Sequence, residues 1–189
     1  MKRDKFWAAL SRVLAVVTIA LFVISALAPG ASAAPKYKVL YRFTGGTDGG
    51  FVDAGVILDS SGNLYGTTLR GGHYDWGVVY KMTLGSNGKW KEQVIHEFRG
   101  GEDGGYVYGG VVFDASGNLY GATIGSEETH GTVYELSPRS GGGWKETILH
   151  RFGGNDGPQG GDVLFDKNGN LYDTTVGNGR KGVVFEITP

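Results

Sequence analysis

The chain has 189 residues, among them 35 glycines, 5 prolines, no cysteine and 12% aromatic residues, with 18 basic and 19 acidic side chains. Glycine weakens a helix interior by about 1 kcal/mol relative to alanine, so this composition excludes a mainly helical protein. The absence of a glycine at every third position excludes collagen, the aromatic content excludes a flexible linker, and a turn-rich, all-β protein remains.

The first 33 residues have the pattern of a secretory signal peptide. Four basic residues precede an uncharged apolar run over 13–27, and small residues at 31–33 supply the pattern that a signal peptidase cleaves. We expect cleavage near Ala33 and a mature chain that begins at Ala34. An uncleaved membrane anchor is the alternative, because the run approaches the length that spans a bilayer. The sequence therefore predicts a protein that is secreted, in the periplasm or outside the cell.

The charge of the mature chain argues against two classes of partner. Four basic residues and one acidic residue lie in 1–33, so 14 basic and 18 acidic side chains remain. Nucleic acid and anionic lipid both attract a clustered basic patch, so we expect no nucleic acid partner and no membrane contact after cleavage. Without cysteine the exported chain has no disulfides, and burial and backbone pairing must stabilise it.

Residues 34–189 contain three tandem repeats of one sequence unit. The segments GNLYGTT, GNLYGAT and GNLYDTT begin at Gly62, Gly117 and Gly169, which are 55 and 52 residues apart. Around each of them the same segments recur in the same order: an apolar run before it, then a GVVY-like run, a KWKEQVIHEF-like run and a Gly-Asp loop. Such a period indicates a repeat architecture, with units at roughly 37–98, 99–152 and 153–189.

Each unit predicts four short strands, a to d. Strand a is an apolar run that ends at an aspartate (Asp59, Asp114 or Asp166), whose carboxylate we expect to accept N–H bonds of the Asn/Gly hairpin turn that follows. Strand b is LYGTT or its equivalent, strand c is the GVVY run, and strand d is the KWKEQVIHEF type. In chain order we expect one d strand at 37–43, two complete sets, and a final a, b and c.

Four-stranded antiparallel units in tandem are typical of β-propeller blades, whereas the competing β-solenoid has shorter repeats. We therefore expect an all-β, β-propeller-like domain of three four-stranded blades over 34–189. Known propellers usually have four to eight blades. The chain is then either a partial propeller, such as the remnant of a longer repeat protein, or half of a six-bladed ring. In the ring, 37–43 of one copy completes the last blade of a second copy, which makes a homodimer.

These motifs resemble the Gloeo/Verruco repeat of exported bacterial proteins, also called the choice-of-anchor GloVer tandem repeat. The matching segments are LYGTT at 64–68, the glycine pair and GVVY within 71–80, LHRF at 149–152 and GGNDGP at 153–158. The resemblance covers nearly all of 36–189 and implies a tandem-repeat protein without an assigned biochemical activity. The hairpin at 59–65 is more loosely similar to NHL-type propeller repeats.

The remaining ionisable residues predict no catalytic or metal site. A catalytic thiol, a nucleophile elbow, a phosphate-binding loop and an HExxH motif are all absent from the sequence. His96 and His150 are repeat equivalents, so we assign them to the shared framework. His73 and His130 lie in the loops between strands b and c, and neither loop offers a second histidine toward the three or four converging ligands that zinc needs. Asp48, Asp103 and Asp156 lie in glycine-rich loops, but each loop offers few of the six to eight oxygens that Ca²⁺ takes. We expect no cofactor, with Ca²⁺ as the open alternative.

One loop differs between the units. Residues 70–76 read RGGHYDW, and the other two units have different residues there. Function commonly lies on variable loops held by a rigid scaffold, and aromatic rings with polar neighbours suit sugar stacking. We predict a site for a glycan or cell-wall polymer formed by Arg70, His73, Tyr74 and Trp76. An ordinary exposed loop is the alternative.

Two classes of function follow. The first is a non-enzymatic, exported binding or surface-interaction scaffold. The second is a propeller-type enzyme, such as a lactonase or lyase similar to NHL-fold enzymes, which would need unique ionisable side chains that converge between the blades. The repeated segments carry no such group, so we expect a scaffold and no enzyme.

Overall fold

The computed structural model describes residues 34–126, 130–153, 161–176 and 181–188. The predicted signal peptide at 1–33 lies outside these residues. The chain divides into two compact units, 1–38 and 39–189. Residues 34–38, the described part of the first unit, are exposed and form no regular secondary structure. Among the described residues, none belongs to a helix with the length and apolar character that a membrane span requires.

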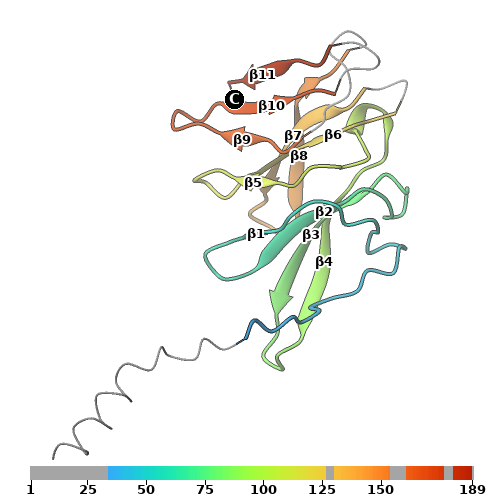
Figure 1. The fold of residues 1–189 in the computed structure, drawn as a ribbon, viewed down its shortest axis with the longest axis vertical. Helices are drawn as coiled ribbons and strands as arrows, with labels where there is room; N and C mark the ends of the chain where they lie inside the picture. Colours follow the sequence, from blue (N-terminus) through green and yellow to red (C-terminus); the bar gives the residue numbers. More distant parts are fainter. Residues whose placement is uncertain (1–33, 127–129, 154–160, 177–180, 189) are drawn as a thin grey trace, which may run out of the picture. The chain divides into compact units, whose positions relative to one another are not determined.

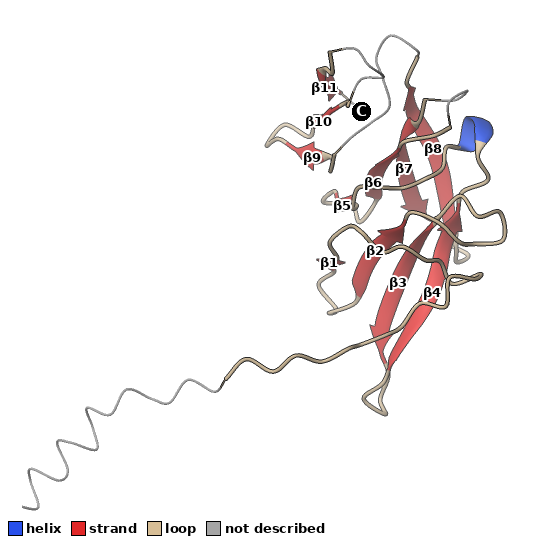
Figure 2. Cartoon of the chain, turned by 45° about the vertical axis from the view of Figure 1, so that its right-hand side comes forward, coloured by secondary structure: helices blue, strands red, loops and turns tan. Residues whose placement is uncertain are grey.

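The second unit is all-β, as predicted, and contains three antiparallel sheets that follow one another in chain order (Figure 1). The first sheet has the strand order β1-β2-β3-β4 and the second has β5-β6-β7-β8, whereas the third has three strands with β10 in the middle. Within the described residues the one helical segment is a 3-10 turn, Gly101–Asp103 (Figure 2). The strands are β1 Ile57–Leu58, β2 Leu64–Thr68, β3 Val78–Leu84, β4 Trp90–Glu97, β5 Val112–Phe113, β6 Leu119–Thr123, β7 Thr132–Pro138, β8 Trp144–Arg151, β9 Leu164–Phe165, β10 Leu171–Thr174 and β11 Val184–Ile187.

An aspartate closes the first hairpin of each sheet. The Asp114 carboxylate accepts hydrogen bonds from the backbone N–H groups of Ser116 and Asn118, both at 2.8 Å. Asp59 and Asp166 accept the equivalent backbone bonds. Burial raises the pKa of Asp114, but these hydrogen bonds outweigh it and hold the pKa below its usual value. The predicted role of the three aspartates in the turns is confirmed.

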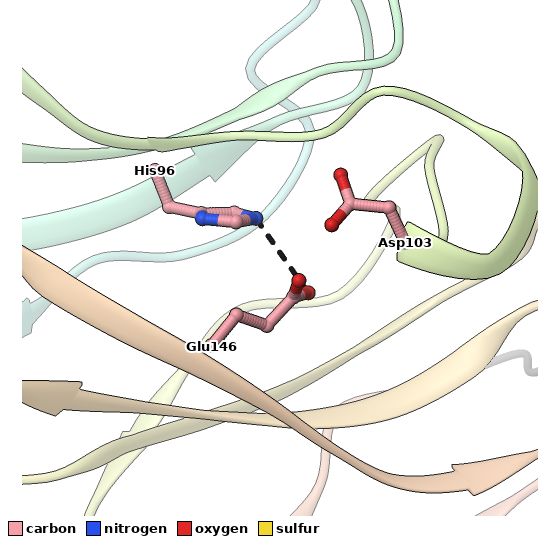
Figure 3. A group of neighbouring side chains, drawn as sticks. All are labelled: His96, Asp103 and Glu146. Carbon is pink, nitrogen blue, oxygen red and sulfur yellow. Dashed lines mark ion pairs between the residues drawn. The ribbon is translucent and has the colours of Figure 1, made fainter.

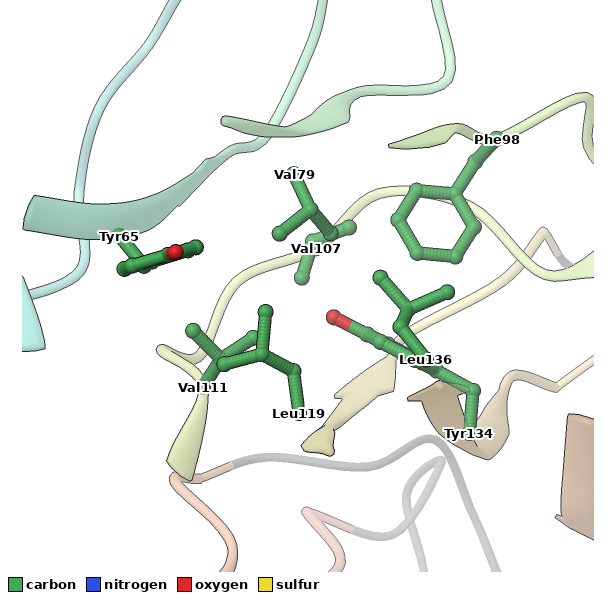
Figure 4. Packing of buried hydrophobic residues seen from close by; sticks show 8 residues of the cluster. All are labelled: Tyr65, Val79, Phe98, Val107, Val111, Leu119, Tyr134 and Leu136. Carbon is green, nitrogen blue, oxygen red and sulfur yellow. The ribbon is translucent and has the colours of Figure 1, made fainter. Parts of the chain in front are cut away.

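The core lies between successive sheets. β6 is buried along its whole length because the second sheet is covered on both faces. The cluster between the first and second sheets is shown in Figure 4 and contains Tyr65, Val79, Phe98, Val107, Val111, Leu119, Tyr134 and Leu136. The cluster between the second and third sheets contains Tyr120, Ala122, Val133, Phe152, Val163 and Leu171. Burial on both faces explains the near-continuous apolar runs in the sequence.

The prediction of a strand at 37–43 is wrong for a single copy of the chain. These residues form no strand, because among the described residues no strand c is available to pair with them. Phe43 nevertheless packs as the end of a strand d does, with its ring centroid 4.8 Å from that of Tyr80 on β3. The equivalent ring pairs are Phe98 with Tyr134 at 5.1 Å and Phe152 with Phe185 at 5.2 Å.

The glycine of strand b makes room for a tyrosine on strand c. Gly121 of β6 lies opposite Tyr134 of β7. A methyl group on Gly121 would lie 2.7 Å from Tyr134 Cζ, which is closer than carbon atoms approach one another. The third unit has a phenylalanine on strand c, and the missing hydroxyl leaves space for a larger residue on strand b. The corresponding pairs are Gly66 with Tyr80 and Asp173 with Phe185.

We expect Gly121→Ala to destabilise the fold by about 1–3 kcal/mol, because the added methyl group overpacks the contact with Tyr134. Urea unfolding followed by tryptophan fluorescence measures this loss. Adding Tyr134→Phe should restore part of it. A methyl group at Gly141 meets nothing within 4 Å, so Gly141→Ala should change stability by less than about 0.5 kcal/mol. Equal losses in the single and double variants would contradict the steric explanation.

Candidate functional site

A groove with a volume of about 800 Å³ lies where β4 adjoins β8. Its wall is formed by β4, by the loop that follows β4, by the start of β8 and by the loop at 70–76. Both aromatic and charged side chains line it, including His73, Tyr74, Arg99, Arg139 and Trp144. This mixed lining suits a ligand with polar groups on an apolar frame.

Three ionisable side chains from different segments point toward one place in this groove (Figure 3). They are His96 on β4, Asp103 at the end of the 3-10 turn, and Glu146 on β8. One N or O atom from each lies within 4.8 Å of the others, and His96 Nε2 is 3.5 Å from Glu146 Oε1. The side chains of His96 and Glu146 are only 16% and 14% exposed. The groove therefore has a nearly buried polar centre, which we call the His96 cluster.

Local structure sets the direction of two of these side chains. The pairing of β3 with β4 shifts its register so that Ile95 is an extra residue directly before His96. Such a β-bulge re-aims the neighbouring side chain. The imidazole packs edge-on against Phe98, with ring centroids 4.6 Å apart. The Asp103 carboxylate accepts a hydrogen bond of 2.8 Å from the backbone N–H of Arg99.

Burial disfavours charge on two members of the cluster, Glu146 and His96. Burial, together with the neighbouring Asp103, raises the pKa of Glu146 to about 9. Burial also lowers the pKa of His96. His96 Nε2 and Glu146 Oε1 are buried and make no hydrogen bond. Leaving buried polar atoms without a partner costs free energy, so both atoms would gain from a ligand.

The first unit has the same arrangement with tyrosine in place of histidine. The repeat equivalents of His96, Asp103 and Glu146 are Tyr41, Asp48 and Glu92. The Tyr41 hydroxyl donates a hydrogen bond of 3.1 Å to Asp48 Oδ2, and the Thr44 N–H donates to the same oxygen at 2.9 Å. Burial, together with the charge of Asp48, raises the pKa of Glu92 to about 7. Here the aspartate is satisfied within the protein.

Two of the four predicted ligand-binding residues, His73 and Tyr74, line the groove. His73 Nδ1 lies 2.9 Å from the Glu97 carboxylate. Tyr74 is 50% exposed, and the Arg99 guanidinium lies 5.5 Å from the centre of its ring. These contacts place the non-repeated loop at the groove.

Arg70 and Trp76 take part in packing and not in the groove lining. The Arg70 guanidinium lies 4.9 Å from the centre of the Tyr106 ring, and Arg70 also pairs with Asp75 at 3.4 Å. Trp76 packs against the core between the first two sheets, with its ring centroid 4.4 Å from that of Tyr106. Both residues thus hold the loop at 70–76 in position.

From the sequence we predicted a framework role for His96 and considered Asp103 only as a Ca²⁺ ligand. Glu146 was not predicted to have a functional role. A signal for the cluster exists in the repeats. His96 and Asp103 are seven residues apart, as are Tyr41 and Asp48, and a glutamate recurs at 92 and 146. Of the three aspartates considered for Ca²⁺, Asp156 lies outside the described residues.

A comparison with family models finds one match, described as the Gloeobacter/Verrucomicrobia repeat, over residues 24–189. The match covers all three units, so the family resemblance of the motifs is confirmed. The search of curated proteins finds no match to the chain.

Proposed function

Since the chain belongs to the Gloeobacter/Verrucomicrobia repeat family, we propose that it is an exported, non-enzymatic scaffold that binds a ligand in the groove between β4 and β8. Export is supported by the charge and hydropathy pattern of 1–33. The observation that carries the binding role is the non-repeated loop at 70–76, which places His73 and Tyr74 on the groove wall. The rest of the loop packs against the repeated framework, as expected of a functional loop on a rigid scaffold.

The chemistry of the groove favours a glycan or cell-wall polymer. Tyr74 and Trp144 offer aromatic surface for the apolar face of a sugar ring. Glu97 can accept hydrogen bonds from sugar hydroxyls, and Arg99 and Arg139 can donate to hydroxyl or carboxylate groups. A ligand with both hydroxyl and carboxylate groups would use all of these side chains.

Binding of purified full chain to a panel of bacterial cell-wall fragments and soluble polysaccharides tests this function. We expect Tyr74→Ala to weaken binding about tenfold, which corresponds to about 1.4 kcal/mol of lost stacking. Tyr108 is equally exposed, at 50%, and does not line the groove. Tyr108→Ala is therefore the matched control and should bind as the unchanged chain does. Absence of binding to every member of the panel would contradict a glycan ligand.

For the assembly, the three sheets are best explained as propeller-like blades, the last of which has only strands a, b and c within the described residues. β11 lies at the edge of the third sheet in the part of the chain that the structure describes, and Val184 on this strand is 79% exposed. The segment 39–43 of a second copy carries the sequence of a strand d and has no strand partner of its own. Pairing of this segment with β11 would complete the blade.

One observation favours the alternative enzyme, a lactonase or lyase. His96, Asp103 and Glu146 converge in the groove, as an acid/base site requires. Turnover of lactones or uronate polymers by the chain, with loss of turnover in Glu146→Gln, would favour this alternative over a scaffold.

A further inference from the structure

We propose that the His96 cluster binds a divalent transition-metal ion, with Zn²⁺ as the expected species. Its ligands are His96 Nε2 and one carboxylate oxygen each from Asp103 and Glu146. The three residues come from β4, the 3-10 turn and β8, so the ion would join the first two sheets. This site is independent of whether the groove binds a glycan.

The spacing of the ligand atoms fits a tetrahedral zinc site. Zn–N and Zn–O bonds of about 2.0–2.2 Å place neighbouring ligand atoms about 3.3–3.6 Å apart. His96 Nε2 and Glu146 Oε1 already have this separation, at 3.5 Å. The atoms of the cluster all lie within 4.8 Å of one another. A closing movement of about 1 Å, which rotation of the Asp103 carboxylate can supply, completes the set.

Two of these atoms lack a hydrogen bond. His96 Nε2 and Glu146 Oε1 are buried and face one another at 3.5 Å, in the ion pair drawn in Figure 3, but neither forms a hydrogen bond. Buried polar atoms in folded proteins nearly always form hydrogen bonds, so one without a hydrogen bond needs an explanation such as an ion. A cation between the two atoms would satisfy both at once.

The donor set selects the class of ion. Imidazole nitrogen suits zinc and its neighbours in the first transition row, whereas Ca²⁺ and Mg²⁺ take oxygen ligands and prefer six or more of them. The two carboxylates of Asp103 and Glu146 match the ion's double positive charge. Three protein ligands leave the fourth tetrahedral position open. All three residues line the groove of about 800 Å³, through which water or a ligand group could reach the ion.

The chain contains its own comparison site. In the first unit, Tyr41 stands where His96 stands in the second and supplies no imidazole. Its hydroxyl donates to Asp48, and the Thr44 hydroxyl donates to the same carboxylate. This carboxylate already has its partners, so we expect one Zn²⁺ ion per chain and not two.

Isothermal titration of the untagged, chelator-treated full chain with Zn²⁺ tests the site. We expect one ion per chain, and tetrahedral absorption bands when Co²⁺ replaces Zn²⁺. His96→Tyr introduces the residue native to the first unit, and Glu146→Gln keeps the shape of the side chain. Each should weaken Zn²⁺ binding at least about 100-fold, because loss of outer-shell partners alone costs 10–100-fold.

Tyr41→Phe is the matched control and should bind Zn²⁺ as the unchanged chain does. Circular dichroism of each variant verifies that the sheets form. No binding of Zn²⁺ by the folded chain would overturn the proposal and favour a proton shared between Asp103 and Glu146. Equal affinity of the unchanged chain and Glu146→Gln would overturn it as well, because the ion would then lie elsewhere.

Discussion

Phe98→Ala should cost about 3–5 kcal/mol of the free energy of unfolding, the range for removing a fully buried aromatic ring. Phe98 follows the last strand of the first sheet, and its side chain is only 1% exposed. Its ring lies 5.1 Å from that of Tyr134 on β7, in the second sheet. The substitution therefore leaves a cavity where two sheets meet. Urea unfolding measured by tryptophan fluorescence and by circular dichroism gives the loss.

Two further phenylalanine-to-alanine substitutions, at less buried positions, serve as controls for Phe98→Ala. Phe51 is 68% exposed, so Phe51→Ala should change stability by less than about 0.5 kcal/mol. Phe43 packs on Tyr80 but stays partly exposed, so Phe43→Ala should cost less than Phe98→Ala. A loss below about 1 kcal/mol for Phe98→Ala would show that the sheets do not depend on this contact.

In solution the chain is expected to have twice the mass of one copy, as measured by light scattering. The reason is that, among the described residues, β11 is an edge strand with Val184 exposed and the segment 39–43 pairs with no strand. Two head-to-tail contacts related by a twofold axis would then close a ring of six sheets. Such a ring removes the exposed edges that otherwise promote aggregation.

Leu40→Pro is the sharpest disruption of this contact. Leu40 is 39% exposed and lies outside any strand of its own chain, so proline should leave the single copy folded. In the ring this segment would pair with β11 on one side, and proline removes a backbone N–H that this pairing can use. We expect Leu40→Pro to have the mass of one copy, and Leu40→Val to keep the doubled mass. A single-copy mass for the unchanged chain would exclude the ring, and a mass that grows with concentration would indicate open filaments.

Sequence alone predicted the strands whose partners are close in the chain. The hairpins of β1 with β2 and of β5 with β6 depend on turn chemistry at Asp59 and Asp114, which is local and therefore readable. The segment 37–43 has the same strand pattern. A sequence pattern does not show whether a partner strand lies beside the segment, and among the described residues this segment pairs with no strand. A strand pattern without a partner strand among the described residues therefore does not become a strand.

The candidate site was predictable only in part, for a related reason. His73 and Tyr74 were readable because their loop breaks the repeat. His96 and Glu146 obey the repeat, and they belong to different sheets that meet only through packing. A residue that recurs is readily assigned to the framework. In this protein the framework itself brings such residues together at the junction between sheets.

Strands b and c of one unit have complementary side chains. Gly121 lies opposite Tyr134 in the second unit, whereas Asp173 lies opposite Phe185 in the third. This complementarity restricts how repeats can be recombined. Each partner limits what the other can be, so a crossover that places strand b of the third unit before strand c of the first or second unit would join an aspartate to a tyrosine and create a clash. Crossovers in the Gly-Asp loops keep every pair intact. Inheritance and protein engineering should therefore exchange these hairpins only as whole modules.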